Sequence, residues 1–187
     1  MKHLKELRIK VLLKEYEHLS LKLEWVESHI NENENEFMDY THSIIDSNVE
    51  LSELYYSNKE DNSIQNIKVN DLTEVIVDND IVEKDPILKK LYRDVVKRTH
   101  PDVVDNIKLN NDYIKVVELY NRDDILGMYL LCDKIGIDYI TYVDIEDVIK
   151  EIDKLRGRVC FLENSYIYQW VETDSDRIIL DYISTQL

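Results

Sequence analysis

The fold class of this chain is decided by residues 9–30, which read IKVLLKEYEHLSLKLEWVESHI. Apolar side chains recur there at intervals of alternately three and four residues, at Ile9, Leu12, Tyr16, Leu19, Leu23, Val26 and Ile30. A mean spacing of about 3.5 residues keeps one seam of an α-helix facing a partner helix, as in a coiled coil. The residues between them are mostly charged, which suits the other faces to water. We therefore expect a long amphipathic helix, whose partner is either a second chain or another part of this one.

The next segment differs, because residues 31–36, NENENE, contain no apolar side chain and asparagine favours helix ends. We expect a turn or a frayed break there. Apolar side chains then resume at helical spacing, at Phe37, Tyr40, Ile44, Ile45, Leu51, Leu54 and Tyr55. Residues 1–56 are therefore predicted to form a helical hairpin or coiled-coil arm. Polar, turn-forming residues predict a linker over 57–83, in which 72–77 can be a strand or one helical turn.

The remaining chain also has helical signals. Asp85-Pro86 favours a helix start, since aspartate caps the first N–H groups and proline lacks one. We expect helices over 87–99, 109–119 and 123–135, the last ended by Gly136. In the C-terminal region 141–187, Asp144 precedes a second seam of Ile145, Val148, Ile152, Leu155, Val159, Leu162 and Tyr166. This seam predicts a long helix, followed by an aromatic cluster at 166–170 and a short helix at 178–183, so the predicted fold class is all-α.

The composition narrows the possible functions. The 23 Lys+Arg against 39 Asp+Glu leave a formal charge of −16, which argues against general binding to nucleic acid because that affinity comes from basic side chains. Cys132 and Cys160 lie far apart without zinc-ligand spacing, so we expect free thiols in a reducing compartment, no metal and no cofactor. The charged N-terminus and the short apolar stretches predict no export signal, no membrane span and a cytoplasmic location.

One segment stands apart in charge: residues 88–102 read LKKLYRDVVKRTHPD. On a helix, the apolar residues share one arc, while Lys89, Lys90, Arg93 and Lys97 gather on another. Pro101 cannot extend the helix and turns the chain at His100, and Asp102 tolerates such a turn. An imidazole and a carboxylate beside a positive face would suit an acidic partner. A solvated helix face followed by an ordinary surface turn is the plainer alternative.

This segment resembles helix II and the following loop of the J domain, the module of DnaJ-type (Hsp40) co-chaperones. The likeness covers about residues 84–140, the J-domain-like module, because Tyr113, Val116, Leu119 and Tyr120 correspond to core-facing residues of the family's third helix. In that family the basic helix and the His-Pro-Asp loop engage an Hsp70 and stimulate its ATP hydrolysis. The resemblance implies this Hsp70-binding role for Lys89, Lys90, Arg93, Lys97, Arg98, His100, Pro101 and Asp102. Size, composition and the aromatic cluster are similar to small J-domain-like proteins of tailed phages and large DNA viruses, which would place the chain in a host cytoplasm.

The sequence also departs from the family. No Tyr-x-x-Leu-Gly element precedes the helix, so the family's first helix is missing, degenerate or replaced by 72–77. Asp94 lies where a basic residue is usual, and Val103-Val104-Asp105 replaces a basic continuation. Each departure weakens the positive surface. The Gly/Phe-rich segment and cysteine-rich zinc modules of the larger DnaJ proteins are also absent, which favours the J-only class.

Two functions remain in competition. In the first, the chain is a co-chaperone that docks on an Hsp70, with helical arms that dimerise or bind a client. In the second, it is a structural or adaptor protein whose coiled-coil seams do the work on a degenerate J-like scaffold. An enzyme is disfavoured: His100 and Asp102 could form an oriented base, but nucleophile, metal-ligand and phosphate-loop motifs are missing. We thus expect a non-enzymatic protein that binds an Hsp70 and can form a homodimer, without nucleic acid or membrane partners.

Overall fold

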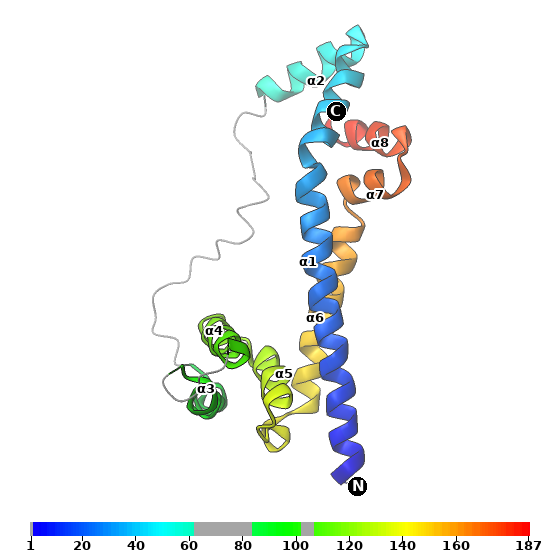
Figure 1. The fold of residues 1–187 in the computed structure, drawn as a ribbon. Helices are drawn as coiled ribbons and strands as arrows, with labels where there is room; N and C mark the ends of the chain where they lie inside the picture. Colours follow the sequence, from blue (N-terminus) through cyan, green and yellow to red (C-terminus); the bar gives the residue numbers. More distant parts are fainter. Residues whose placement is uncertain (1, 62–83, 102–106) are drawn as a thin grey trace. The chain divides into compact units, whose positions relative to one another are not determined.

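A computed structural model describes residues 2–61, 84–101 and 107–187. Within these ranges the chain forms eight α-helices, one 3-10 turn and no strand, so the all-α prediction is confirmed (Figure 1). The elements are α1 (Lys2–Asp46), α2 (Val49–Asp61), α3 (Pro86–Thr99), α4 (Ile107–Asn121), α5 (Ile125–Ile135), η2 (Ile140–Tyr142), α6 (Ile145–Glu163), α7 (Tyr166–Thr173) and α8 (Asp176–Gln186). The stretch 72–77, for which strand and helix were both open, lies outside the described residues.

The chain divides into two compact units. Among the described residues, unit 1 comprises 2–22, 84–101 and 107–157, and unit 2 comprises 23–61 and 158–187. The units differ from the consecutive segments expected from the sequence, because the two long helices α1 and α6 each contribute to both. A local pattern shows where a helix runs, whereas unit membership depends on which helices pack together.

The expected break at 31–36 is wrong, and α1 is one continuous helix of 45 residues. Glutamate is a good helix former, and every second residue of the run is glutamate. The run places only the half-buried Asn33 on the seam, where its side-chain amide donates to the His29 carbonyl at 2.7 Å. Val26 and Phe37 are buried on either side of it. Burial of the same face before and after the run therefore carries the helix through it.

A hairpin that turns at residues 31–36 is therefore absent. The chain turns after Asp46, and the Asn48 side chain accepts a hydrogen bond from the Leu51 N–H at 3.2 Å at the start of α2. Helix α2 extends to Asp61, so the first residues of the predicted linker, 57–61, are helical. Residues 62–83 lie outside the described part of the chain.

The predicted seam of α1 packs against its own chain. In unit 1, Ile9 and Leu19 are buried in the same core as Val148 and Ile152 of α6. The Arg156 guanidinium of α6 also pairs with the Glu15 carboxylate of α1 at 2.5 Å. The sequence left open whether the seam packs against a second chain or against its own chain. At these seam positions the contacts are within the chain.

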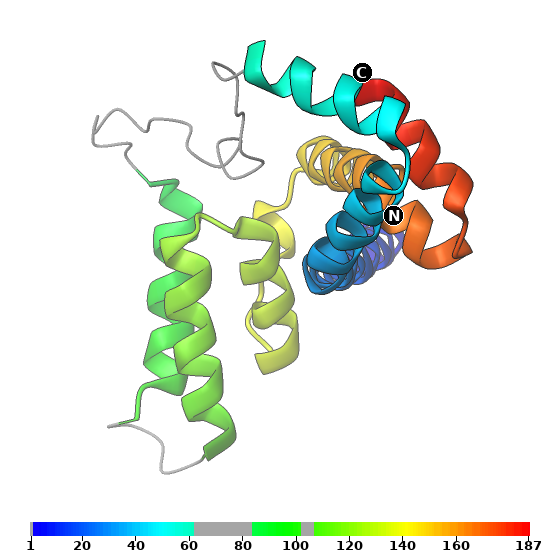
Figure 2. The same ribbon diagram turned by 90° about the horizontal axis from the view of Figure 1, so that it is seen from above.

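The core of unit 1 is drawn from α1, α3, α4, α5 and α6. Helix α5 is its most buried element, with Leu126, Gly127, Met128, Tyr129, Leu131 and Cys132 buried. In Figure 2, α5 lies between the α3–α4 pair and the unit 1 portions of α1 and α6. Since complete burial of one large apolar side chain contributes about 1.5–3 kcal/mol, this core is the main source of stability for the hairpin that carries His100.

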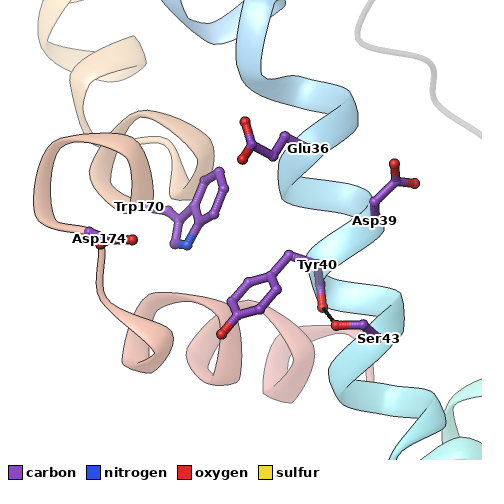
Figure 3. Close-up of a pocket in the computed structure, with 6 residues that line it drawn as sticks. All are labelled: Glu36, Asp39, Tyr40, Ser43, Trp170 and Asp174. Atoms are coloured by element: carbon purple, nitrogen blue, oxygen red, sulfur yellow. Dashed lines mark hydrogen bonds between the residues drawn. The ribbon is translucent and has the colours of Figure 1, made fainter.

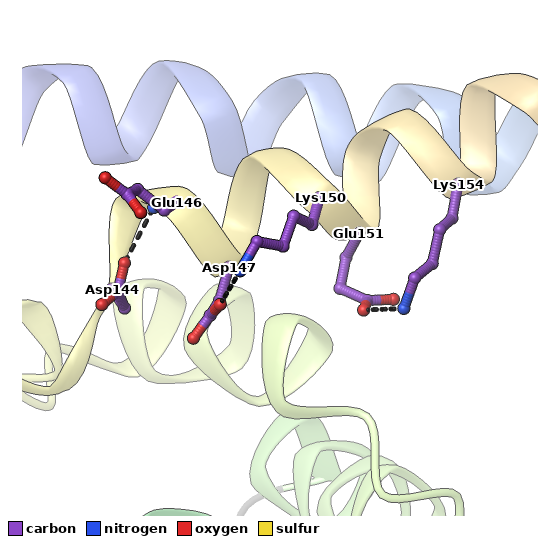
Figure 4. A network of polar contacts seen from close by, with 6 residues as sticks. All are labelled: Asp144, Glu146, Asp147, Lys150, Glu151 and Lys154. Carbon is purple, nitrogen blue, oxygen red and sulfur yellow. Dashed lines mark hydrogen bonds and ion pairs between the residues drawn. The ribbon is translucent and has the colours of Figure 1, made fainter.

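Gly136 ends α5 as predicted, in a left-handed conformation with φ of 73°. The predicted Asp144 cap of α6 is confirmed as well, because its carboxylate accepts the Glu146 N–H at 2.8 Å. Ion pairs three residues apart, Lys150 with Asp147 and Lys154 with Glu151, follow along the exposed face (Figure 4). Each such exposed pair contributes only about 0.2–0.5 kcal/mol, so α6 is held mainly by its buried seam.

The core of unit 2 joins the later part of α1 with α2, α7 and α8. Its buried members are Phe37, Ile45, Tyr55, Trp170, Ile179 and Ile183. The predicted aromatic cluster at 166–170 is helical, with Ser165 as the N-cap of α7 and Asp174 ending it at a left-handed φ of 48°. The predicted short helix at 178–183 lies within α8. Aromatic side chains from α7 thus supply much of the packing against α1.

Candidate functional site

The basic segment forms α3, and its local structure follows from its sequence. The Asp85 carboxylate accepts the Ile87 N–H at 2.6 Å, and Pro86 occupies the first turn. One face is buried and consists of Leu88, Leu91, Val95 and Thr99. The Thr99 hydroxyl satisfies its hydrogen bond inside the helix by donating to the Val95 carbonyl at 3.0 Å. The opposite face is left to solvent.

Helices α3 and α4 form an antiparallel hairpin whose two ends are both held by side chains. At one end, Lys84 donates to the Tyr120 carbonyl at 2.6 Å and to Asp123 at 2.9 Å. Tyr92 stacks on Tyr120 with ring centroids 4.3 Å apart. At the other end, the His100 ring meets Tyr113 edge to face at 5.2 Å. The beginning of α3 therefore lies beside the end of α4 (Figure 2).

The turn after α3 is shaped by His100 and Pro101. The His100 N–H donates to the Val96 carbonyl at 2.9 Å and closes the last turn of the helix. Its backbone is extended, with φ −60° and ψ 132°, as required of a residue before proline. The His100 side chain is half-buried and Pro101 is exposed. Asp102, the third predicted residue of this turn, lies outside the described residues.

Two of the predicted basic residues contact neighbouring elements. The Arg98 guanidinium donates to the carbonyls of Ile135 and Gly136 at the end of α5, at 3.2 Å each. Lys90 lies over the Tyr142 ring, 4.6 Å from its centroid, and hydrogen-bonds the Tyr142 hydroxyl. A cation at a helix C-terminus also interacts favourably with the helix dipole. Arg98 and Lys90 thus hold α3 against α5 and η2, a role that the sequence analysis missed.

Arg93 and Lys97 form the centre of the solvent-facing positive surface, with the half-buried Lys89 beside them. Lys97 pairs weakly with Asp94, at 3.8 Å, so the acidic residue that departs from the family pattern offsets part of this charge. Arg93 has no ion pair within the described residues. Lys90 and Arg98 are exposed as well, so their contacts with η2 and α5 leave both side chains at the surface of α3.

Other side chains of unit 1 serve its packing. Asp112 of α4 is buried and pairs with Lys134 of α5 at 2.6 Å. Burial raises the pKa of the Cys132 thiol to about 12, with a further contribution from the Asp94 charge, whereas Cys160 is exposed. Both cysteines are free, as predicted. Within the described residues no group of His, Cys, Asp and Glu side chains is arranged to hold a metal ion.

A cavity that was not predicted from the sequence lies in unit 2 (Figure 3). It is a cavity of about 470 Å³ lined by Glu36, Asp39, Tyr40, Ser43, Trp170 and Asp174. The signal for it in the sequence is the aromatic cluster predicted at 166–170, which contains Trp170. The sequence does not show that Trp170 lies beside residues 36–43 of α1.

The chain matches no protein-family model, no curated protein and no solved structure. None of the described helices combines the length and the apolar character that a bilayer crossing requires. The functional conclusions therefore rest on the geometry of the two sites.

Proposed function

We propose that this protein is a J-domain-like co-chaperone that docks on a cytoplasmic Hsp70 and stimulates its ATP hydrolysis. The observation that carries the proposal is an α3 face with exposed Arg93 and Lys97, which ends in the His100-Pro101 turn of an antiparallel helical hairpin. This is the arrangement that the resemblance to the J domain leads one to expect.

The physical argument depends on how the docking surface is supported. Leu88, Leu91 and Val95 bury the opposite face of α3, so the basic side chains project from a rigid helix. The contact between His100 and Tyr113 holds the turn against α4. Charges at the edge of such a surface act mainly on association with an acidic partner. The turn would then contribute the shape-specific contact.

The decisive experiment is a single-turnover ATPase assay with the Hsp70 of the native host. The wild-type protein should accelerate hydrolysis, and His100→Gln should abolish the stimulation while far-UV circular dichroism stays unchanged. Arg93→Gln should raise the half-maximal concentration about two- to fivefold at low salt. Lys115→Gln is the matched control, since Lys115 is an exposed basic residue of α4. Absence of stimulation by the wild-type protein would refute the proposal.

A pull-down from the native host tests binding to the Hsp70 separately from the stimulation of its ATP hydrolysis. Wild-type protein should retain an Hsp70, and His100→Gln should lose it. Retention of the same Hsp70 by both proteins would show that the turn does not make the specific contact.

A structural or adaptor role is the second candidate, favoured by an apolar stripe on the first turns of α1. Leu4, Leu7 and Val11 are 69%, 51% and 60% exposed and are spaced by three and four residues. Because the predicted seam of α1 is buried or half-buried within the chain, self-association would use this stripe. The substitution Leu19→Asp would place a charge in the unit 1 core and unfold the protein, so it cannot test assembly.

The appropriate variant for the second candidate is Leu7→Gln combined with Val11→Gln. If the stripe joins two copies, light scattering should show a dimer for the wild-type protein and a monomer for the variant. A wild-type monomer at about 100 μM, where a micromolar dimer would be formed, would exclude this assembly.

A further inference from the structure

We propose that the cavity of unit 2 binds a lysine or arginine side chain presented by a peptide segment of another protein. The cavity is formed by α1 on one side and by α7 with its C-terminal turn on the other (Figure 3). Its volume of about 470 Å³ is in the range of ligand pockets. The proposal is independent of Hsp70 docking, which involves unit 1.

The charge of the lining favours a cation. Glu36, Asp39 and Asp174 are exposed carboxylates, and no ion pair neutralises them within the described residues. The lining contains no lysine or arginine. Three carboxylates around one opening attract a cation and repel anions, although exposed charges alone provide little affinity.

Two aromatic rings provide the surface on which a cation can rest. Tyr40 and Trp170 are stacked, with centroids 6.1 Å apart and planes 28° from parallel. Trp170 is further held by Phe37, edge to face at 5.5 Å, and the Tyr40 hydroxyl donates to Asp176 at 2.9 Å. The rings are therefore held in place before a ligand arrives. An ammonium or guanidinium group within about 6 Å of such a ring face is attracted by the ring quadrupole.

The indole N–H of Trp170 indicates that the ligand also contains a hydrogen-bond acceptor. Only 9% of Trp170 is exposed, and its N–H makes no hydrogen bond within the described part of the chain. Figure 3 shows the indole nitrogen pointing towards the space between Tyr40 and Asp174. The indole nitrogen opens onto the cavity and is not enclosed by the protein, so an acceptor on a ligand can reach it and form a hydrogen bond.

These features together select a basic peptide over other cations. A metal ion or a polyamine would meet the carboxylates but offers no acceptor to the indole. A peptide containing lysine or arginine supplies both a cation for the carboxylates and rings, and a backbone carbonyl for Trp170. A simple acidic surface would bind a polyamine as well as it binds a basic peptide. Preference for the peptide is therefore the property that can be measured.

The test uses the full-length ¹⁵N-labelled protein and the two indole N–H resonances of Trp25 and Trp170, assigned with Trp25→Phe. The probe is the blocked peptide acetyl-Ser-Lys-Ser-amide, titrated to about 10 mM, where a millimolar complex is nearly saturated. The Trp170 resonance should shift in a saturable manner and the Trp25 resonance should not. The same peptide with arginine should behave similarly, and one with norleucine should bind at least about tenfold more weakly.

Charge-neutral variants test the lining directly. Glu36→Gln combined with Asp174→Asn should weaken binding of the lysine peptide about three- to tenfold, and asparagine tolerates the left-handed backbone at 174. Glu34→Gln, on the same helix but outside the lining, is the matched control and should bind as the wild type does.

Three results would overturn the proposal. The first is no shift of the Trp170 resonance. The second is an equal shift with spermidine, which would identify a non-selective acidic surface. The third is unchanged lysine-peptide binding by the double variant.

Discussion

The carboxylate of Asp124 offers the sharpest test of how unit 1 is assembled. It accepts the Gly127 N–H at 2.7 Å and so caps α5, and it also accepts the Tyr16 hydroxyl of α1 at 3.1 Å. The substitution Asp124→Ala removes both hydrogen bonds. We expect a loss of about 1 kcal/mol for the helix cap and about 1 kcal/mol for the half-buried hydroxyl, or about 2 kcal/mol in total.

Asp144→Ala is the matched control, because Asp144 caps α6 through the Glu146 N–H alone and is exposed. It should cost only about 1 kcal/mol. Urea unfolding followed by far-UV circular dichroism measures both free energies of unfolding. A double-mutant cycle of Asp124→Ala with Tyr16→Phe should show a coupling of about 1 kcal/mol. Equal costs for the two aspartate variants, together with no coupling to Tyr16, would show that the contact between α1 and α5 contributes nothing.

Three other predictions follow from the packing of unit 1. In the native protein at pH 8, iodoacetamide should modify Cys160 and spare Cys132, because a thiol pKa of about 12 leaves about one thiolate in ten thousand; peptide mass spectrometry reads this out. Gly127→Ala should destabilise unit 1 by about 1–3 kcal/mol in urea unfolding, since a Cβ would lie 2.4 Å from an Asp124 oxygen and 2.5 Å from Leu119. Burial raises the pKa of Tyr16 and of Tyr129 to about 12, with the Asp124 charge also acting on Tyr16. A raised pKa stabilises the fold while the phenol is protonated, so stability should fall between about pH 10 and pH 12, less steeply in Tyr16→Phe, as pH-dependent urea titrations would show.

Local signals in the sequence were sufficient for most helix boundaries. Asp85-Pro86 and Asp144 begin helices and Gly136 ends one, because capping depends on a few neighbouring residues. The break predicted at 31–36 failed because the composition of a short run was weighed without the burial of the residues on either side. Val26 and Phe37 share one buried face, and their packing outweighs the preference of asparagine for helix ends.

The candidate docking site was only partly predictable. The buried and exposed arcs of α3 follow from helical periodicity, so Arg93 and Lys97 appear on the exposed face in both sequence and structure. Periodicity on one helix cannot reveal a partner on another. The contacts of Arg98 with the end of α5, and of Lys90 with Tyr142, depend on how α3 packs in unit 1.

By itself, the sequence determined that the described chain is helical and which stripe of each long helix is apolar, because hydrogen bonding, capping and periodicity act within a few residues. It also determined the basic arc of α3 and the turn at His100-Pro101, since proline acts on its nearest neighbours. Only the tertiary structure decided that the seam of α1 meets its own chain. The tertiary structure alone also brings Trp170 beside Tyr40 to form the cavity. These residues are 130 positions apart, and a contact over that separation arises from packing and produces no periodic pattern in the sequence.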